Sequence, residues 1–406
     1  MKKYKKALEE TTPEQGSIRS ILDQLVVNGA QRMVQEALEA ELTDYLGRLR
    51  YARHEPEKDK QYRNGHSKPR QLGVGCGTIS VRTPRLREAF ESAIVDHYQR
   101  MSPAVATLLP ELYMHGLSTG DFQTCFSAFL GDGASLSSSS IVRMKQQWEE
   151  EYQHWKKRDL DREYLYVWVD GVYPKAGPKD ENMAVLVVVG VNRQGQKELL
   201  AIEEGYRESA ESWRDVFRDL KRRGLRWIGL VIGDGIGGLW KALRDVYPVA
   251  RQQRCWVHKM RNVVDKVPQQ SHDDVLQSLR EIYAAPSKDR ALGLLKAFRL
   301  TYGQRYPKAV ASLDEAGELL FSYFAFPRRH WISLKSTNVI ESLFSAVKLR
   351  TDAARRIPRR ESALYLVYKL LMHQQQRLHR FHGYKLVAQT IELMQLKRNA
   401  RLRIAA

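Results

Sequence analysis

Cysteine is scarce in this 406-residue sequence, and long apolar runs are missing from it. The three cysteines (Cys76, Cys125 and Cys255) are far apart in sequence, which implies no disulfide framework and suits a reducing compartment. No apolar run approaches the roughly 20 residues that a membrane-spanning helix needs. The basic start, MKKYKKALEETTPEQG, is not followed by the apolar segment of a signal peptide. We therefore expect a cytoplasmic protein that does not bind a membrane.

Acidic residues are also in short supply, and the deficit is uneven. The chain has 66 Lys+Arg against 47 Asp+Glu, a net charge of +19. Residues 347–406 alone hold 14 Lys/Arg against 3 Asp/Glu, a net of +11. A basic surplus concentrated in this way indicates a polyanionic partner, and nucleic acid is the first candidate. A solvated basic face is the weaker interpretation.

The first part of the chain is predicted to contain two small regions. Residues 1–60 form a helical region, because 17–50 carry apolar side chains at helical spacing, with a break expected at Asn28–Gly29. So long an apolar stripe needs partner helices, which predicts dimerisation and a homodimer. Residues 61–102 form a basic module with a short strand in GTISVRTPRLRE (77–88).

Residues 103–158 have the layout of a helix-turn-helix DNA-binding domain. Small polar residues precede each predicted helix, and glycines separate them: Ser118 or Thr119, then Gly131–Gly133, then Ser137 or Ser138. The second helix would present Ser139, Arg143 and Lys145 to a DNA groove. A plain helical hairpin accounts for the pattern equally well.

The pattern changes to α/β from residue 159. Strands are predicted at YLYVWV (164–169), MAVLVVVGV (183–191), KELLAIE (197–203) and within LRWIGLVIGD (225–234), so 159–261 is the first part of an α/β core. Residues 262–326 read as helices throughout. Residues 327–375 return to the core, with helices beginning near Ser336 and Arg360, and 376–406 form a basic helix or tail.

Two of the predicted strands end in an acid, Asp170 and Asp234. Taken alone, Asp170–Gly171 is more typical of a turn. Together, however, strand-end carboxylates are ligands that hard divalent cations prefer, and two such ions can clamp an in-line phosphoryl displacement. Glu341, four residues after Thr337, is the third candidate, although its local pattern alone favours an exposed helix residue.

A glycine pattern around Asp234 imitates another function. Gly233, Gly235 and Gly238 match the G-x-G-x-x-G of dinucleotide-binding folds. We reject this interpretation because Asp234 inside the loop would repel a pyrophosphate. The acid expected on the next strand is also missing from VARQQRC (249–255).

Several segments, taken in order, resemble the Mutator-type transposases of bacterial insertion sequences, within the Asp-Asp-Glu transposase superfamily. They are RNGH (63–66), TPRLRE (83–88), HGLSTGDF (115–122), VDGVY (169–173), ESAESWRDVFRDLKRRGL (208–225), LVIGDGIGGL (230–239), RQQRCWVHKMRNVVDKVP (251–268) and RRHWISLKSTNVIESLF (328–344). The resemblance implies an RNase H-like α/β catalytic domain with an all-helical insertion, preceded by mainly helical DNA-binding domains. It implies strand nicking at terminal inverted repeats and transfer of a 3′-OH to target DNA.

The resemblance also implies a site. Asp170, Asp234 and Glu341 would be the catalytic residues and would bind two Mg²⁺ ions, with Mn²⁺ as an alternative. A related metal nuclease without strand transfer, or a catalytically silent DNA-binding regulator, are the alternatives. Residues expected to contact DNA are Arg63, Arg82, Arg85, Arg87, Ser139, Arg143, Lys145, Arg328, Arg329, Trp331, Lys348, Arg350, Arg355 and Arg356.

Two expectations concern single motifs. Cys255 and His258 form a C-x-x-H that matches the family pattern; zinc would need further ligands, so a structural use is favoured. Trp331 either stacks on a base near the cut end or belongs to the core. A protein of this kind would act in the bacterial cytoplasm, associated with the nucleoid.

Overall fold

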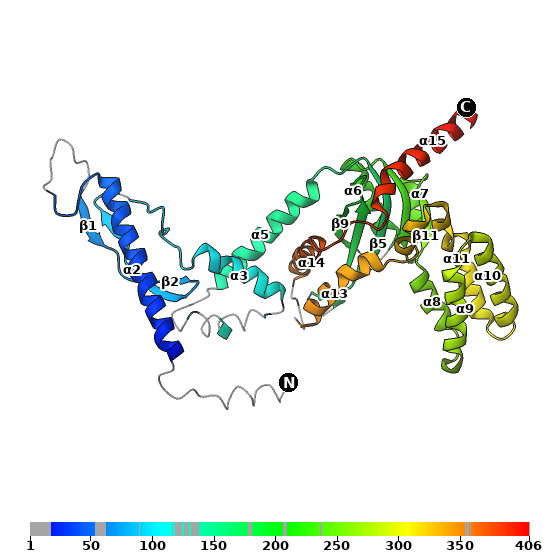
Figure 1. Ribbon diagram of the computed structural model, residues 1–406, viewed down its shortest axis with the longest axis horizontal. Coiled ribbons are helices and arrows are strands. Elements are labelled where there is room, and N and C mark those ends of the chain that lie inside the picture. Colours follow the sequence, from blue (N-terminus) through cyan, green and yellow to red (C-terminus); the bar gives the residue numbers. More distant parts are fainter. Residues whose placement is uncertain are drawn as a thin grey trace. The chain divides into compact units, whose positions relative to one another are not determined.

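The structure is a computed structural model with a mixed α/β fold. It describes residues 18–52, 62–88, 90–115, 117, 124–125, 130, 138–177, 181–205, 209–235, 238–353, 357 and 359–405. The chain divides into two compact units, Met1–Met144 and Lys145–Ala406. Figure 1 shows the helices and strands of both.

The smaller unit combines a long helix with two small antiparallel sheets (Figure 1). Helix α2 (Ile18–Leu46) packs on β3 (Gly77–Val81), which pairs with β2 (Arg70–Val74). Strand β1 (Arg63–His66) pairs with β4 (Pro84–Leu86), so the strand predicted within 77–88 is in fact two strands. The buried apolar core consists of Leu38, Leu72, Ile79, Val81 and Val95.

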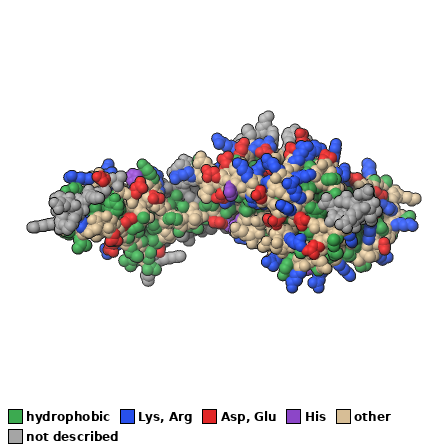
Figure 2. Space-filling model, turned by 90° about the horizontal axis from the view of Figure 1, so that it is seen from above, with side chains coloured by type: hydrophobic (Ala, Val, Ile, Leu, Met, Phe, Trp, Pro, Cys, Tyr) green, Lys and Arg blue, Asp and Glu red, His purple; other side chains and the backbone are tan. Residues whose placement is uncertain are grey.

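Helix α2 runs without interruption through Asn28 and Gly29, so the predicted break is wrong. Glycine inside a helix costs about 0.5–1 kcal/mol relative to alanine. Val27, Ala30 and Val34 flank this position and pack against the core of the smaller unit, and their burial outweighs that cost. Figure 2 shows hydrophobic side chains gathered on the smaller unit, and α2 contributes exposed ones: Ile21, Leu22, Leu25, Val26 and Met33.

The region expected to be a helix-turn-helix is described only in part. Helix α3 (Pro103–Met114) begins after Ser102, whose hydroxyl accepts a hydrogen bond from the Val105 N–H. Helix α5 (Ser138–Lys157) begins where the second DNA-binding helix was predicted to begin. The helix predicted between Ser118 and Gly131 lies largely outside the described residues. The helix-turn-helix therefore stays a prediction.

The larger unit is centred on a five-stranded sheet with the order β11-β10-β5-β8-β9. Strands β5, β10 and β11 are parallel to one another, while β8 is antiparallel to both β5 and β9. The four predicted strands and the predicted hairpin of 183–203 are confirmed. The five strands of the sheet are β5 (Glu163–Val172), β8 (Ala184–Val191), β9 (Lys197–Gly205), β10 (Trp227–Gly233) and β11 (Arg251–Arg254).

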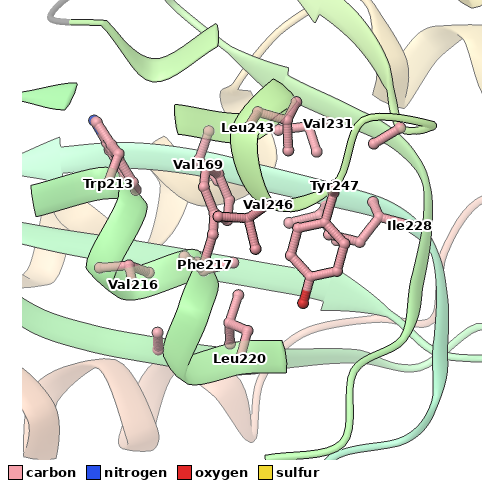
Figure 3. Close-up of a cluster of buried hydrophobic side chains, with 14 of the residues drawn as sticks. Val169, Trp213, Val216, Phe217, Leu220, Ile228, Val231, Leu243, Val246 and Tyr247 are labelled. Atoms are coloured by element: carbon pink, nitrogen blue, oxygen red, sulfur yellow. The ribbon is translucent and has the colours of Figure 1, made fainter. Parts of the chain in front are cut away.

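One face of this sheet is covered by helices α6 (Ala210–Arg222) and α7 (Leu239–Val246). Their apolar sides meet the strands in a single buried cluster (Figure 3). Phe217 is fully buried there, and it lies among Trp213, Leu243 and Val169 of the same cluster. Both helices are amphipathic, as the sequence predicts for 209–224, so burying this face stabilises the sheet and the helices together.

The other face carries two aromatic side chains of β5, Tyr166 and Trp168. Successive side chains of a strand point to opposite faces, so Tyr166 and Trp168 lie opposite Val167 and Val169. The ring of Phe381 contacts both Tyr166 and Trp168, and the Tyr166 hydroxyl lies 2.6 Å from His330 Nδ1. The helices that follow are α12 (Trp331–Leu334), α13 (Asn338–Ala353), α14 (Arg360–Gln375) and α15 (Val387–Ala405). Of these, α13 contacts β5 and β8, and α14 contacts β9.

A block of helices separates β11 from α13, as predicted for 262–326. It lies beyond the β11 edge of the sheet in Figure 1. Its main helices are α8 (Trp256–Val264), α9 (His272–Ala284), α10 (Lys288–Tyr302) and α11 (Pro307–Ala316), followed by short 3-10 turns. Lys259 anchors the block, since its buried ammonium donates to the Ser312 carbonyl and to Glu315.

Candidate active site

Asp170 and Asp234 lie on neighbouring parallel strands at the same end of the sheet. The register of β5 and β10 places Trp168 opposite Ile232, and each acid comes two residues later. Neighbouring strands are about 4.8 Å apart, so the two carboxylates project from adjacent positions. Both residues are half-buried. The register therefore places the two residues at neighbouring positions on adjacent strands.

The Asp170–Gly171 pair is not a turn, so that interpretation is wrong. Strand β5 continues to Val172, with Asp170 opposite Val187 and Gly171 opposite Leu186 of β8. The antiparallel neighbour therefore still pairs with the backbone at this point, although β10 ends at Gly233 on the other side. Asp170 is thus held by a paired strand, and its carboxylate also accepts a hydrogen bond from the Gly171 N–H at 2.8 Å.

Three glycines shape the turn that carries Asp234. Gly235 and Gly238 have φ of +77° and +79°, a region that suits glycine. A Cβ on Gly233 would lie 2.6 Å from Leu239 Cδ2 and 2.9 Å from Val169 Cγ2. The glycine pattern is therefore accounted for by backbone geometry and close packing around Asp234, in keeping with the rejection of the dinucleotide interpretation.

Glu341 is positioned by the first turn of α13. The carbonyl oxygen of Thr337 accepts hydrogen bonds from the N–H groups of Ile340 and Glu341, at 2.9 and 3.0 Å. The Thr337 hydroxyl donates to Glu341 Oε1 at 2.6 Å. Glu341 is half-buried, so it is not the exposed helix residue that its local pattern favoured. Its helix contacts β5, the strand of Asp170.

His258 connects two of the three acids. Its Nε2 atom lies 3.7 Å from Glu341 Oε1. Its pKa is raised to about 9, first by a hydrogen bond with Cys255 and then by the charges of Cys255, Asp170 and Glu341, against the opposing effect of burial. The imidazole therefore lies close enough to Asp170 and Glu341 for both carboxylates to favour its charged form.

Cys255 makes hydrogen bonds to the end of β10 and to the residue before α13. It is fully buried between β11 and α8. Its N–H donates to the carbonyl of Gly233 at 2.8 Å, and its sulfur accepts from the Thr337 N–H at 3.3 Å. The predicted structural use of the C-x-x-H motif accords with these contacts. Sequence reasoning noted Thr337 only for its spacing from Glu341; its place before an apolar helix start was a signal for a capping residue.

The donor chemistry of the site fits a hard divalent cation. Asp170, Asp234 and Glu341 offer carboxylate oxygens from two strand ends and a helix, which is the ligand type that Mg²⁺ and Mn²⁺ prefer. A second donor set, Cys255, His258 and Glu341, has ligand atoms within 4.8 Å of one another. Its sulfur is already engaged by Thr337, which favours the carboxylate set.

Seven of the fourteen residues expected to contact DNA are exposed at the surface of their unit. Figure 2 shows Lys and Arg side chains over the visible face of the larger unit, with acidic ones among them. The exposed candidates are Arg82, Arg85, Arg87 and Arg143 in the smaller unit and Arg328, Arg329 and Lys348 in the larger one. These seven are placed where a phosphate can reach them.

The other candidates are less accessible. Arg63 is bound to Glu39 of α2 at 2.9 Å, and burial together with Arg359 lowers the pKa of Lys145. Arg350 is only 3% exposed, so the expectation that it neutralises a phosphate is not favoured. Ser139 belongs to α5, but its side chain lies outside the described residues, as do Arg355 and Arg356.

Trp331 occupies an aromatic cluster rather than a free surface position. Its ring meets those of Tyr323 and Phe324 edge to face, at centroid distances of 5.6 and 4.8 Å. Its Nε1 donates to the Phe326 carbonyl at 2.8 Å. Because the side chain is half-buried, packing explains its presence without a base to stack on.

Known proteins resemble this chain along most of its length. Residues 1–380 match the sequence profile of the family described as Transposase, Mutator family. The transposase for insertion sequence element IS6120 of Mycolicibacterium smegmatis is 45% identical over 268 residues, covering 66% of this chain and 83% of that protein. The transposase for ISRM5 of Rhizobium meliloti is 35% identical over 341 residues, covering 83% and 84%. The transposase for IS905 of Lactococcus lactis is 27% identical over 381 residues, covering 91% and 95%.

Among the described helices, none combines the length and the apolar character needed to cross a bilayer.

Proposed function

Because the chain belongs to the Mutator family of transposases, we propose that it moves an insertion sequence by metal-dependent nicking of DNA and transfer of the resulting 3′-OH end. One observation carries the proposal. Asp170 and Asp234 lie on neighbouring strands at the same end of the sheet. Glu341 lies 3.7 Å from His258, whose pKa is raised in part by the charges of Glu341 and Asp170. These relations support a site at one end of the sheet that is built from three acids remote in sequence.

The proposal includes an RNase H-like catalytic domain. Its support is the order of the acids along the fold. Asp170 lies on the first strand of the five-stranded sheet, Asp234 follows the fourth, and Glu341 lies on a helix beyond the helical block. These are the positions that the resemblance to Asp-Asp-Glu transposases implies. The helical block of 262–326 then corresponds to the insertion between the second and third acids.

In this mechanism the three acids bind metal rather than transfer protons. Asp170, Asp234 and Glu341 would hold two divalent ions, Mg²⁺ or Mn²⁺. Bound there, the ions supply positive charge to the attacking and leaving oxygens of an in-line displacement at phosphorus. The strand register sets the spacing of the first two carboxylates, and Thr337 orients the third. Nicking uses water and transfer uses a 3′-OH, so one site serves both steps.

DNA recognition is assigned to basic surfaces on both units. Arg328 and Arg329 are exposed a few residues before the Glu341 helix, where they would neutralise phosphates near the cut end. Arg82, Arg85 and Arg87 are exposed in the smaller unit and would contribute to binding the terminal inverted repeats, together with the predicted helix-turn-helix. Such contacts make binding weaken steeply with salt.

Two copies of the chain would hold the two ends of the element. The proposal of a homodimer rests on the exposed apolar side chains at the start of α2, a surface that favours a second helix. The protein would act in the cytoplasm, on nucleoid DNA.

The test uses the full-length chain, uncut and pre-cut duplexes from the inverted repeat beside its gene, and supercoiled target plasmid. Joined product is expected with Mg²⁺ or Mn²⁺ and none with chelator. Asp170→Asn, Asp234→Asn and Glu341→Gln should abolish cleavage and joining while leaving binding to the inverted repeat. The matched controls are Asp289→Asn and Glu281→Gln, both exposed on the helical block.

Each outcome separates the alternatives. Cleavage without a joined product would support the plain nuclease. Binding without metal-dependent cleavage would support the regulator. Cleavage at the wild-type rate by any of the three acid variants would refute the site.

A further inference from the structure

The strand end that carries Asp234 and the helix that carries Glu341 are linked by hydrogen bonds. The Gly233 carbonyl, one residue before Asp234, accepts from the Cys255 N–H at 2.8 Å. The Cys255 sulfur accepts from the Thr337 N–H at 3.3 Å. The Thr337 hydroxyl reaches Glu341 Oε1 at 2.6 Å. These contacts join segments 82 residues apart in the sequence.

The direction of these hydrogen bonds follows from the chemistry of the groups. A carboxylate only accepts, so the single proton of the Thr337 hydroxyl goes to Glu341 Oε1. The same hydroxyl oxygen also lies 3.3 Å from Cys255 Sγ and 3.5 Å from His258 Nδ1. Thr337 is fully buried, and its β-branched side chain has few rotamers. The hydroxyl is therefore fixed in place.

A second contact holds the same junction rigid. The Trp256 N–H donates to the Lys335 carbonyl at 2.9 Å, next to the bond between Thr337 and Cys255. Trp256 is itself fully buried, and its Nε1 donates to the Leu320 carbonyl at 2.8 Å. The start of α8 and the loop before α13 are thus joined by two hydrogen bonds, one from Trp256 and one to Cys255.

We infer that Thr337 and Cys255 are positioning residues, which set the orientation of the Glu341 carboxylate relative to Asp234 for binding a divalent cation. With Oε1 held by Thr337, Glu341 is left to bind an ion through Oε2. The inference rests on the proposed function, because it assumes that Glu341 is a metal ligand. Outer partners of metal ligands typically change metal affinity or activity about 10–100-fold when removed.

The experiment measures Mn²⁺ binding and DNA cleavage by the full-length chain. Thr337→Val keeps the shape but removes the hydroxyl, and it is expected to weaken Mn²⁺ binding and cleavage about 10–100-fold. Thr337→Ser restores the hydroxyl and should stay within a few-fold of wild type. Cys255→Ala should lie between them, because it acts through Thr337. Electron paramagnetic resonance measures the concentration of free Mn²⁺, and the bound Mn²⁺ is the total minus this value.

Thr351→Val is the matched control, since Thr351 lies on the same helix and its hydroxyl donates to the helix carbonyls of Val347 and Lys348. Melting of the metal-free proteins shows whether each variant folds. A folded Thr337→Val that binds Mn²⁺ and cleaves like wild type overturns the inference. If Thr337→Val does not fold, equal Mn²⁺ binding by Thr337→Ser, Cys255→Ala and wild type overturns it. Failure of wild type to cleave refutes the proposed function instead.

Discussion

Replacing Gly235 by alanine is expected to damage both folding and DNA cleavage, because the residue has φ of +77° directly after Asp234. An added Cβ would lie 2.5 Å from Trp240 Nε1 and 3.1 Å from Arg254 Nε. Both neighbouring side chains are held in place by other contacts. Trp240 is a buried residue of α7 within the core cluster, and Arg254 is bound to Glu315 at 3.0 Å.

The magnitude has two parts. A non-glycine residue in the left-handed region costs about 1–2 kcal/mol, and overpacking of a well-filled site costs about 1–3 kcal/mol. At roughly 2–4 °C per kcal/mol for a unit of this size, the melting temperature should fall by about 4–20 °C. A shift of Asp234 by about 1 Å would lower cleavage on the order of 100-fold.

Calorimetric melting and a nicking assay on the inverted-repeat duplex measure the two effects. The matched control is Gly293→Ala, an exposed position inside α10 with nothing within 4 Å of its added Cβ. Removing glycine there should raise stability by about 0.5–1 kcal/mol and leave cleavage unchanged. If Gly235→Ala melts and cuts like wild type, the steric account of the Asp234 turn is wrong.

Three further outcomes are expected. Phe217→Ala leaves a cavity under the sheet and should cost about 3–5 kcal/mol in unfolding free energy, and a cost below about 1 kcal/mol would contradict the packing in Figure 3. Without metal, protonated His258 should contribute its full stabilisation of the fold below pH 6.5 and lose this contribution as pH rises through about 9, because its pKa is raised in the folded state. If the melting temperature of His258→Gln depends on pH in the same way as that of wild type, this prediction is wrong. Leu25→Glu, at a side chain 63% exposed, should convert the proposed dimer to a monomer in light scattering while leaving melting of the larger unit unchanged. A monomeric wild type would refute the proposed dimer.

Much of the architecture could be read from local patterns. The runs YLYVWV and AVLVVVGV are apolar over the length of a strand, and both are buried strands of the sheet. The amphipathic spacing of 209–224 likewise predicted α6, and residues 262–326 proved helical. These predictions succeed because the spacing of apolar residues within a segment determines which of its sides is buried away from water.

Local patterns were misleading where another segment decided the outcome. Asp170–Gly171 looks like a turn, but the pairing of β8 keeps it in a strand. Asn28–Gly29 looks like a helix break, but packing of Val27 and Val34 on the core of the smaller unit keeps α2 continuous. Arg350 looks like a phosphate contact, yet it is buried.

The candidate site divides in the same way. The sequence by itself placed Asp170 and Asp234 at strand ends, because an apolar run followed by an acid is a local signal. Only the tertiary structure placed Glu341 beside His258 and joined Cys255 to Thr337. Hydrogen bonds between residues about 80 positions apart depend on how whole elements pack, and no local preference encodes that contact. Packing therefore decided which neighbours orient the third acid.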